Sequence, residues 1–230
     1  MTKEFFHSQK LLLGMLVVMM GVLLLPVILF GPNKSSLVLN QFHALWADDF
    51  FKWVTHFGEF TFIVPVVLIL YIVRRRALAL AVTCNSLLAL VLTYGLKHYI
   101  FPHTKRPFGL YGQVASLHLV DGVQVHSCNT FPSGHTMAAF AVFMFLAFNV
   151  KGWAKYLCFL IAVGVGLSRI YLFQHFALDV ISGAMVGSLI AFFAHSVMMV
   201  DGSLVSFRLR LKKRVKKTEE EWAPCRELKK

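Results

Sequence analysis

Side chains that can bind an anion or attack phosphorus gather in the second half of the chain, at the ends of apolar segments. His175 and Asp179 are four residues apart, so on a helix they would share one face. The Asp179 carboxylate can accept a hydrogen bond from one imidazole nitrogen and leave the other free to attack or to accept a proton. Arg169 ends the preceding apolar run, and its planar guanidinium suits phosphate oxygens. The pattern predicts a nucleophile facing an anion-binding cation. The alternative is a buried His–Asp pair that only satisfies itself.

A second group is the segment Pro132-Ser133-Gly134-His135, just before the apolar run that starts at Met137. Ser133 is the expected N-cap of a helix, and Gly134 lets an anion approach the backbone. The free N–H groups and positive end of that helix can hold the anion, with His135 at the rim to donate a proton. A charge at a helix centre in the membrane costs roughly 2.5–3.5 kcal/mol. So many polar groups at one depth therefore predict a single phosphate site.

The elements that must position these residues are apolar segments able to span a bilayer, which takes about 20 residues each. The chain has 230 residues, and 57% of them are hydrophobic, which is too many for an ordinary soluble domain. We therefore predict an all-α polytopic membrane protein with a bundle of about six membrane-spanning helices: residues 11–30, 57–73, 77–97, 135–150, 155–173 and 176–200. Residues 1–200 would form the membrane domain and residues 201–230 a basic cytoplasmic tail.

The placement of Lys and Arg predicts the orientation, because cytoplasmic loops carry an excess of these residues. With the N-terminus inside, 17 of the 23 Lys and Arg residues lie on the inner face, ten of them in the tail, and six lie on the outer face. This arrangement predicts a multi-pass protein of the inner (cytoplasmic) membrane, with both termini cytoplasmic and the site facing the periplasm or exterior. A juxtamembrane basic tail suits acidic lipid headgroups, so no nucleic-acid partner is expected.

Two further outward segments complete the predicted architecture. Residues 31–56 are expected to form one amphipathic helix along the interface. A plain packing stripe is the alternative for the aromatic residues, which are spaced three or four apart: Phe42, Trp46, Phe50 and Trp53, with Phe57 directly after the segment. Residues 98–134 form a long loop with four histidines expected at the surface: His98, His103, His118 and His126. In the last span, Gly183 and Gly187 offer a small-residue face for close helix packing.

Together these residues resemble the type 2 phosphatidic acid phosphatase and vanadium haloperoxidase superfamily. That family shows a lysine separated by six residues from Arg-Pro, then Pro-Ser-Gly-His, then Ser-Arg with five residues to His and three more to Asp. Here Pro132 to His135 match the second motif, and Ser168-Arg169, His175 and Asp179 match the third with its spacing intact. Arg106-Pro107 supplies the end of the first motif.

The chain departs from the family's first motif at one position. Tyr99 stands where the lysine is expected, and Lys97 lies two residues further back. We favour Lys97 as the phosphate-binding lysine because the end of an apolar helix gives it a defined direction. Lys105, adjacent to Arg106, is the competing candidate.

The resemblance implies a lipid phosphatase that works through a phosphohistidine. His175 would attack phosphorus, Asp179 would orient it, and His135 would protonate the leaving lipid oxygen. The phosphoryl oxygens would be held by five residues: Lys97, Arg106, Ser133, Gly134 and Arg169. Because fixed cations would balance the phosphate charge, no metal or other cofactor is expected, and the four cysteines have no metal-ligand spacing. The expected partner is a phosphorylated lipid within the bilayer.

A site facing outward suggests an envelope lipid as the substrate. Undecaprenyl diphosphate and the phosphates of lipid A are the first candidates, followed by phosphatidylglycerol phosphate and phosphatidic acid. A haloperoxidase is disfavoured because those relatives are soluble. The alternative from another class is a transport-type or non-catalytic membrane protein that binds phosphorylated lipid. A transporter would gather its polar groups near the bilayer midplane, whereas here they lie at one end of the spans.

Overall fold

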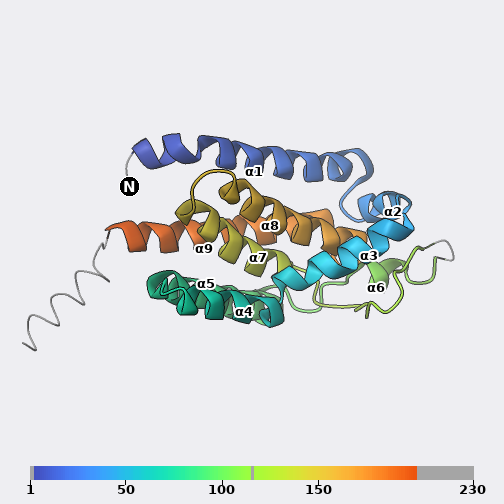
Figure 1. Cartoon of the computed structure of the whole chain (residues 1–230). Coiled ribbons are helices and arrows are strands. Elements are labelled where there is room, and N and C mark those ends of the chain that lie inside the picture. Colours follow the sequence, from blue (N-terminus) through green and yellow to red (C-terminus); the bar gives the residue numbers. More distant parts are fainter. Residues whose placement is uncertain (1–2, 115–116, 201–230) are drawn as a thin grey trace, which may run out of the picture.

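The long apolar segments form helices that lie side by side in the computed structural model, which describes residues 3–114 and 117–200 (Figure 1). The described part of the chain contains helices and loops and no β-strand. The helices are α1 (Lys3–Phe30), α2 (Lys34–Asn40), α3 (Leu45–Val54), α4 (Phe60–Ile72), α5 (Arg76–Gly95), α6 (Pro107–Tyr111), α7 (Gly134–Asn149), α8 (Ala154–Tyr171) and α9 (Ala177–Val200). A 3-10 turn, η1 (Thr55–Gly58), precedes α4, and a π-helical turn, η2 (Leu96–Ile100), extends α5. The prediction of an all-α fold is confirmed.

Helix α7 lies at the centre of the bundle, packed against α9, α8 and α5. It is apolar on every side, which is typical of a buried helix, and 11 of its 16 residues are buried. Helix α9 approaches it closely through two glycines. A Cβ atom added to Gly187 would lie 2.4 Å from the Met137 carbonyl oxygen, and one added to Gly183 would lie 2.6 Å from that of Ser133. The predicted small-residue face of the last span is therefore confirmed.

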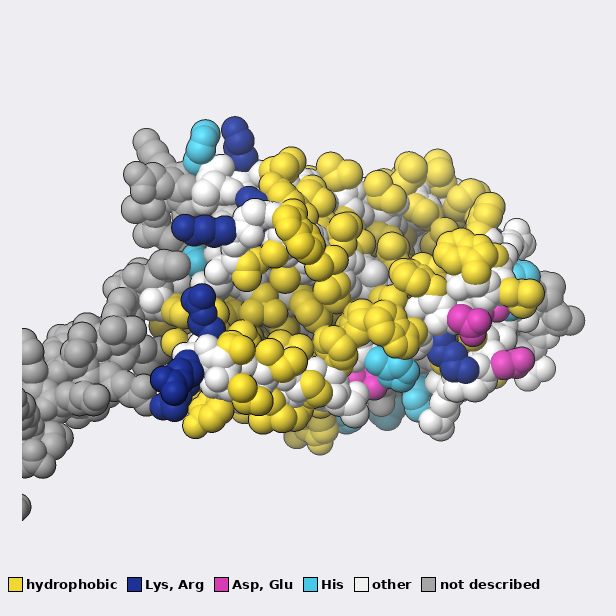
Figure 2. Space-filling model, viewed as in Figure 1, with side chains coloured by type: hydrophobic (Ala, Val, Ile, Leu, Met, Phe, Trp, Pro, Cys, Tyr) yellow, Lys and Arg dark blue, Asp and Glu magenta, His cyan; other side chains and the backbone are white. Residues whose placement is uncertain are grey.

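The outer helices turn large apolar side chains away from the bundle, as expected of surfaces that face lipid. Ile28 of α1, Ile72 of α4 and Val91 of α5 are among them, and Ile72 is 75% exposed. Figure 2 shows a hydrophobic band between two polar ends. Lys and Arg gather mainly at the end where α1 begins and α9 finishes, whereas the visible Asp and Glu side chains and several His side chains lie toward the end near α3. The chain is a membrane protein.

The prediction of about six spans is not confirmed. Among the described residues, four helices are long and apolar enough to cross a membrane, or five if the bent pair Leu45–Gly58 and Phe60–Ile72 counts as one span. The predicted span 135–150 is α7, whose 16 residues reach only about 24 Å, less than the roughly 30 Å of hydrocarbon. Because its neighbours surround it, α7 is covered by protein and need not match the bilayer in length.

The prediction of one amphipathic helix over residues 31–56 is wrong, since α2 and α3 are separate. The Asn40 side chain hydrogen-bonds to both backbone groups of His118, at 2.8 and 2.9 Å, and the His43 ring stacks on the His118 ring. These contacts tie the break between the two helices to the 98–134 loop. His118 is therefore half-buried and structural, not a surface histidine. Trp46 and Trp53 remain 73% and 63% exposed, so they are not an internal packing stripe.

The predicted basic tail, residues 201–230, lies outside the described residues, and the division of the chain into a membrane domain and a tail stays a prediction.

Candidate active site

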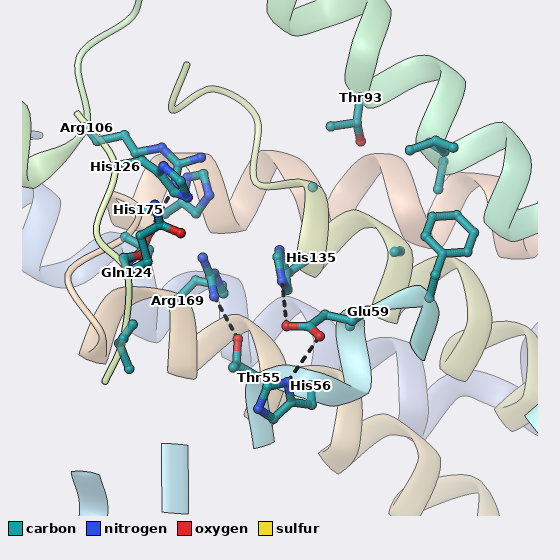
Figure 3. Close-up of a pocket in the computed structure, with 18 of the residues that line it drawn as sticks. Thr55, His56, Glu59, Thr93, Arg106, Gln124, His126, His135, Arg169 and His175 are labelled. Carbon is teal, nitrogen blue, oxygen red and sulfur yellow. Dashed lines mark hydrogen bonds and ion pairs between the residues drawn. The ribbon is translucent and has the colours of Figure 1, made fainter. Parts of the chain in front are cut away.

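A cavity of about 560 Å³ opens at the end of the bundle where the 98–134 loop covers the helices. Several elements that are distant in sequence contribute to its wall: η1, η2, the loop, the start of α7, the end of α8 and the turn before α9. Six residues singled out from the sequence line it: Lys97, Arg106, Gly134, His135, Arg169 and His175. Figure 3 shows Arg106, Arg169, His135 and His175 around this space.

The three cations reach the cavity from three different elements. Lys97 comes from η2, Arg106 from the residue before α6, and Arg169 from the last turn of α8. All three line the same cavity, and Lys97 is the lysine that the sequence analysis favoured. Lys105 does not line the cavity, and its backbone instead forms an isolated bridge with Cys128. The structure thus brings Lys97, and not Lys105, to the other predicted groups.

Hydrogen bonds hold both guanidinium groups in place. Arg106 donates from Nε to the Cys128 carbonyl at 2.9 Å and from Nη1 to Gln174 Oε1 at 2.9 Å. Arg169 donates from Nη1 to Thr55 Oγ1 at 2.8 Å. The Nε atom of Arg169 is buried and has no hydrogen-bond partner in the described structure. A buried, unpartnered donor on a cation is costly, so this atom is suited to an anionic ligand in the cavity.

His175 and Asp179 form a buried pair behind this group of cations. His175 Nδ1 lies 3.3 Å from Asp179 Oδ2, and the same oxygen accepts hydrogen bonds from the Thr130 hydroxyl and from the Phe176 N–H, the latter at 2.9 Å. Asp179 is in the first turn of α9, but His175 lies in the turn before that helix. The two residues therefore do not share a helix face. The carboxylate instead reaches back across the start of α9.

The surroundings of His175 favour a neutral imidazole. The residue is 1% exposed, and burial, together with the positive charges of Arg169, Arg106 and Lys97, lowers the pKa of His175 well below its usual 6.5. With Asp179 accepting from Nδ1–H, the tautomer assigned to this geometry leaves the Nε2 lone pair free. A neutral histidine with a free Nε2 is the form that can attack phosphorus.

In the Pro132–His135 segment, the structure places one residue, Ser133, differently from the prediction. Ser133 is the N-cap residue of α7, but its side chain is fully buried, its hydroxyl hydrogen-bonds to that of Thr136 at 2.9 Å, and it does not line the cavity. Its backbone N–H donates to the Asp179 carbonyl at 3.1 Å, which joins α7 to α9. Gly134 does line the cavity, and a Cβ there would lie 2.9 Å from Thr93 Cγ2, so the glycine also permits α5 to pack.

Sequence reasoning missed four residues that the structure adds to the site. Thr55 holds Arg169, Gln174 holds Arg106, Thr130 holds Asp179, and Glu59 lies beside His135. Gln174 stands directly before His175, and Glu59 is a lone acid at the start of an apolar segment; both were signals in the sequence. His126, expected at the surface, is exposed, and it also lines the cavity.

Comparison with known proteins identifies the family of this chain. The sequence pattern of the PAP2 superfamily matches residues 76–202. The chain is 32% identical over 159 residues to a protein of Bacillus licheniformis named bacitracin transport permease protein BcrC, covering 63% of this chain and 77% of that protein. It is 28% identical over 178 residues to phosphatidylglycerophosphatase B of Bacillus subtilis, covering 70% of this chain and 78% of the relative.

Solved structures show the same fold. The crystal structure of Aquifex aeolicus LpxE superposes with a TM-score of 0.61 at 26% identity, covering 70% of this chain and 92% of that one. A PAP2-type phosphatidylglycerolphosphate phosphatase from Bacillus subtilis gives a TM-score of 0.62 at 22% identity, over 80% and 94% of the two chains. The chain therefore belongs to the PAP2 superfamily, and it is a membrane phosphatase of lipid phosphates.

Proposed function

We propose that this protein removes phosphate from an envelope lipid through a phosphohistidine formed on His175. The observation that carries the proposal is the convergence of Lys97, Arg106 and Arg169 with His175 on one cavity. Three fixed cations can neutralise a phosphoryl group and stabilise the charge that spreads over its oxygens in the transition state. The backbone of Gly134, at the N-terminus of α7, adds a further anion-binding element.

The proposed reaction has two steps. First, His175 Nε2 forms a bond to phosphorus while the bond from phosphorus to the lipid oxygen breaks, and His135 gives that oxygen a proton. Water then attacks the phosphohistidine and loses a proton to His135, which releases phosphate and restores both histidines. Asp179 keeps the His175 ring oriented throughout. In this scheme the cations of the protein supply the charge that a bound metal supplies in many phosphatases.

The shape of the cavity supports a substrate that is partly embedded in the membrane. Beside its cationic end, the cavity is lined by apolar side chains of α4, α5 and α7, including Phe60, Leu90 and Ala138. A headgroup at the cations and hydrocarbon along these helices would suit a phosphorylated lipid. We rank undecaprenyl diphosphate and lipid A phosphate first, with phosphatidylglycerol phosphate and phosphatidic acid next. The names of two matched relatives refer to phosphatidylglycerophosphate and support phosphatidylglycerol phosphate within the second pair.

We place the protein in the cytoplasmic membrane with this cavity at the outer face. The support is the distribution of charge, because Arg74, Arg75, Arg76, Lys151 and Lys155 lie at the opposite end of the bundle. A transport function is the competing assignment, and one relative has transport permease in its name. It is disfavoured because the polar groups lie together at one end of the bundle, not at the middle of the spans.

The test is phosphate release by the purified protein in detergent from a panel of the four lipids, with and without a chelator. We expect phosphate release from at least one lipid, unchanged by the chelator. His175→Ala should abolish release while the variant elutes from a sizing column like the unaltered protein. Retained activity in this variant would contradict the assigned nucleophile, and no release from any lipid would contradict the function itself.

A further inference from the structure

Glu59 is an unexpected residue in a site built for phosphate. Among the described residues that line the cavity, it alone carries a carboxylate. A negative charge beside an anionic substrate repels it, so a carboxylate there weakens binding unless it has a separate task. The contacts of this side chain indicate what the task is.

Glu59 lies between His135 and His56, two of the histidines that line the cavity, as Figure 3 shows. Its Oε1 atom is 3.5 Å from His135 Nε2, at the long limit of a hydrogen bond. Its Oε2 atom is 3.1 Å from His56 Nδ1 and accepts a hydrogen bond from the Thr61 hydroxyl at 3.2 Å. Glu59 Oε2 is therefore held by residues close to it in sequence, and Oε1 faces His135, the predicted general acid.

The backbone fixes this position. Gly58 brings η1 so close to α7 that an added Cβ would lie 2.8 Å from the His135 carbonyl oxygen and 2.8 Å from Val165 Cγ1. The next residue, Glu59, then begins α4 as its N-cap residue. Because the glycine packs directly on the backbone of His135, the carboxylate of the following residue is set beside the His135 ring.

We propose that Glu59 is a positioning residue that orients His135 and favours its protonated form for its role as general acid; this inference rests on the proposed function. In this arrangement, His135 Nε2–H donates to Glu59, and Nδ1 is the nitrogen that gives its proton to the lipid oxygen. The carboxylate stabilises the imidazolium before the transfer and the tautomer after it. Asp179 does the corresponding work for the nucleophile.

The charges around His135 explain why it needs this partner. Burial, and then the positive charges of Arg169 in α8 and Lys97 in η2, lower the pKa of His135. His175 faces it from the turn before α9. Each cation disfavours a further positive charge nearby, and therefore disfavours the protonated imidazole. Glu59 is the negative charge that offsets them, and His56 is the one further titratable group in contact with Glu59 in the described structure.

The experiment compares Glu59→Gln with the unaltered protein on two substrates: the lipid of the panel with the highest rate, and p-nitrophenyl phosphate. Nitrophenolate leaves readily without a proton, whereas a lipid alkoxide or phosphate needs an acid. We expect Glu59→Gln to lower kcat for the lipid roughly 10- to 100-fold and to affect p-nitrophenyl phosphate much less. The alkaline limb of the lipid pH profile should move to lower pH.

Asp49→Asn is the matched control, because Asp49 is an exposed acid of α3 that does not line the cavity. It removes the same charge and should leave both rates and the pH profile unchanged. Glu59→Asp should restore part of the lipid rate. If Glu59→Gln does not fold, Glu59→Asp carries the test, because its shorter side chain draws the carboxylate away from Nε2.

Equal rates and pH profiles for Glu59→Gln and the unaltered protein would overturn the inference. So would an equal loss on both substrates with no change in the pH profile. In either case, inactivity of His175→Ala together with activity of the unaltered protein would leave the proposed function standing. A failure of the function itself would be recognised separately, since the unaltered protein would then release no phosphate from any lipid.

Discussion

At the scale of single residues, the Asp179 carboxylate is the group that contacts the proposed nucleophile. One oxygen of Asp179 contacts His175 Nδ1, the Thr130 hydroxyl and the Phe176 N–H. Three partners on one buried oxygen leave the carboxylate little freedom to rotate, so the ring it contacts is fixed as well. The lowered pKa of His175, caused by burial and then by the nearby cations, keeps that ring neutral.

Replacing the Asp179 carboxylate should separate the orientation of the His175 ring from the binding of the substrate. Asp179→Asn keeps the size of the side chain but favours the wrong His175 tautomer, so kcat should fall by about 10⁴-fold, as for a catalytic triad aspartate. Thr130→Val removes one hydrogen bond to the same oxygen and should cost much less. Steady-state rates on the lipid substrate check both variants. A larger loss for Thr130→Val than for Asp179→Asn would contradict the role given to Asp179.

The pH dependence follows from the same residue. A histidine with a lowered pKa stays unprotonated as the pH falls through 6.5 and becomes inactive as a nucleophile only below that value. The acid limb of kcat/KM, which reports the free enzyme, should therefore lie below pH 6.5. Initial rates at low substrate concentration, taken between about pH 4 and 8 in steps of roughly half a pH unit, measure this limb. An acid limb at or above 6.5 would show that His175 is not held neutral.

At the scale of elements, the contact between α7 and α9 joins two parts of the site. Helix α7 carries His135 and α9 carries Asp179, and the Ser133 N–H donates to the Asp179 carbonyl where the two helices begin. The glycines of α9 let the backbones approach. The separation of His135, the proposed general acid, from Asp179 is thus set by helix packing.

A larger side chain in this contact should disturb stability and activity together. Gly187→Leu places a Cβ 2.4 Å from the Met137 carbonyl and should cost about 1–3 kcal/mol of stability, with loss of activity. Gly21→Leu is the control, because nothing lies within 4 Å of a Cβ at that position of α1. Thermal unfolding in detergent measures both. A Tm for Gly187→Leu equal to that of Gly21→Leu would contradict the tight packing.

At the scale of the whole molecule, charge is divided between the two ends of a hydrophobic band (Figure 2). The Lys and Arg side chains gather mainly at one end, and the cavity opens at the other. Positive charge is retained on the cytoplasmic side of a membrane, so the division favours a cavity at the outer leaflet. An enzyme in this orientation would act on lipids of the outer face.

Labelling of single cysteines tests this orientation. Cys128 is exposed in the loop near the cavity, and Lys151 is exposed in the turn between α7 and α8. With the other native cysteines replaced by serine, a membrane-impermeant maleimide should label Cys128 in intact cells. Lys151→Cys, in a background without native cysteines, should react only after the membrane is permeabilised. The reverse pattern would place the site on the cytoplasmic side.

Local pattern in the sequence was sufficient for much of this protein. The predicted spans 11–30, 77–97 and 176–200 correspond closely to α1, α5 and α9, because a long apolar run in a bilayer must satisfy its own backbone as helix. The spacing of Ser168-Arg169, His175 and Asp179 indicated the family, since motif spacing is itself a property of the sequence. The superfamily assignment was therefore available before any coordinates.

Only the tertiary structure decided how these pieces meet. The break between α2 and α3 depends on Asn40 and His43 contacting His118, which is 78 residues away from Asn40. Ser133 turned out to lie beside Thr136, outside the cavity wall, and Lys97 in that wall, because helix packing determines where each side chain points. Glu59 is 76 residues from His135, and no local pattern joins them. Sequence periodicity records which residues can form a helix, whereas long-range contacts depend on how the finished helices pack.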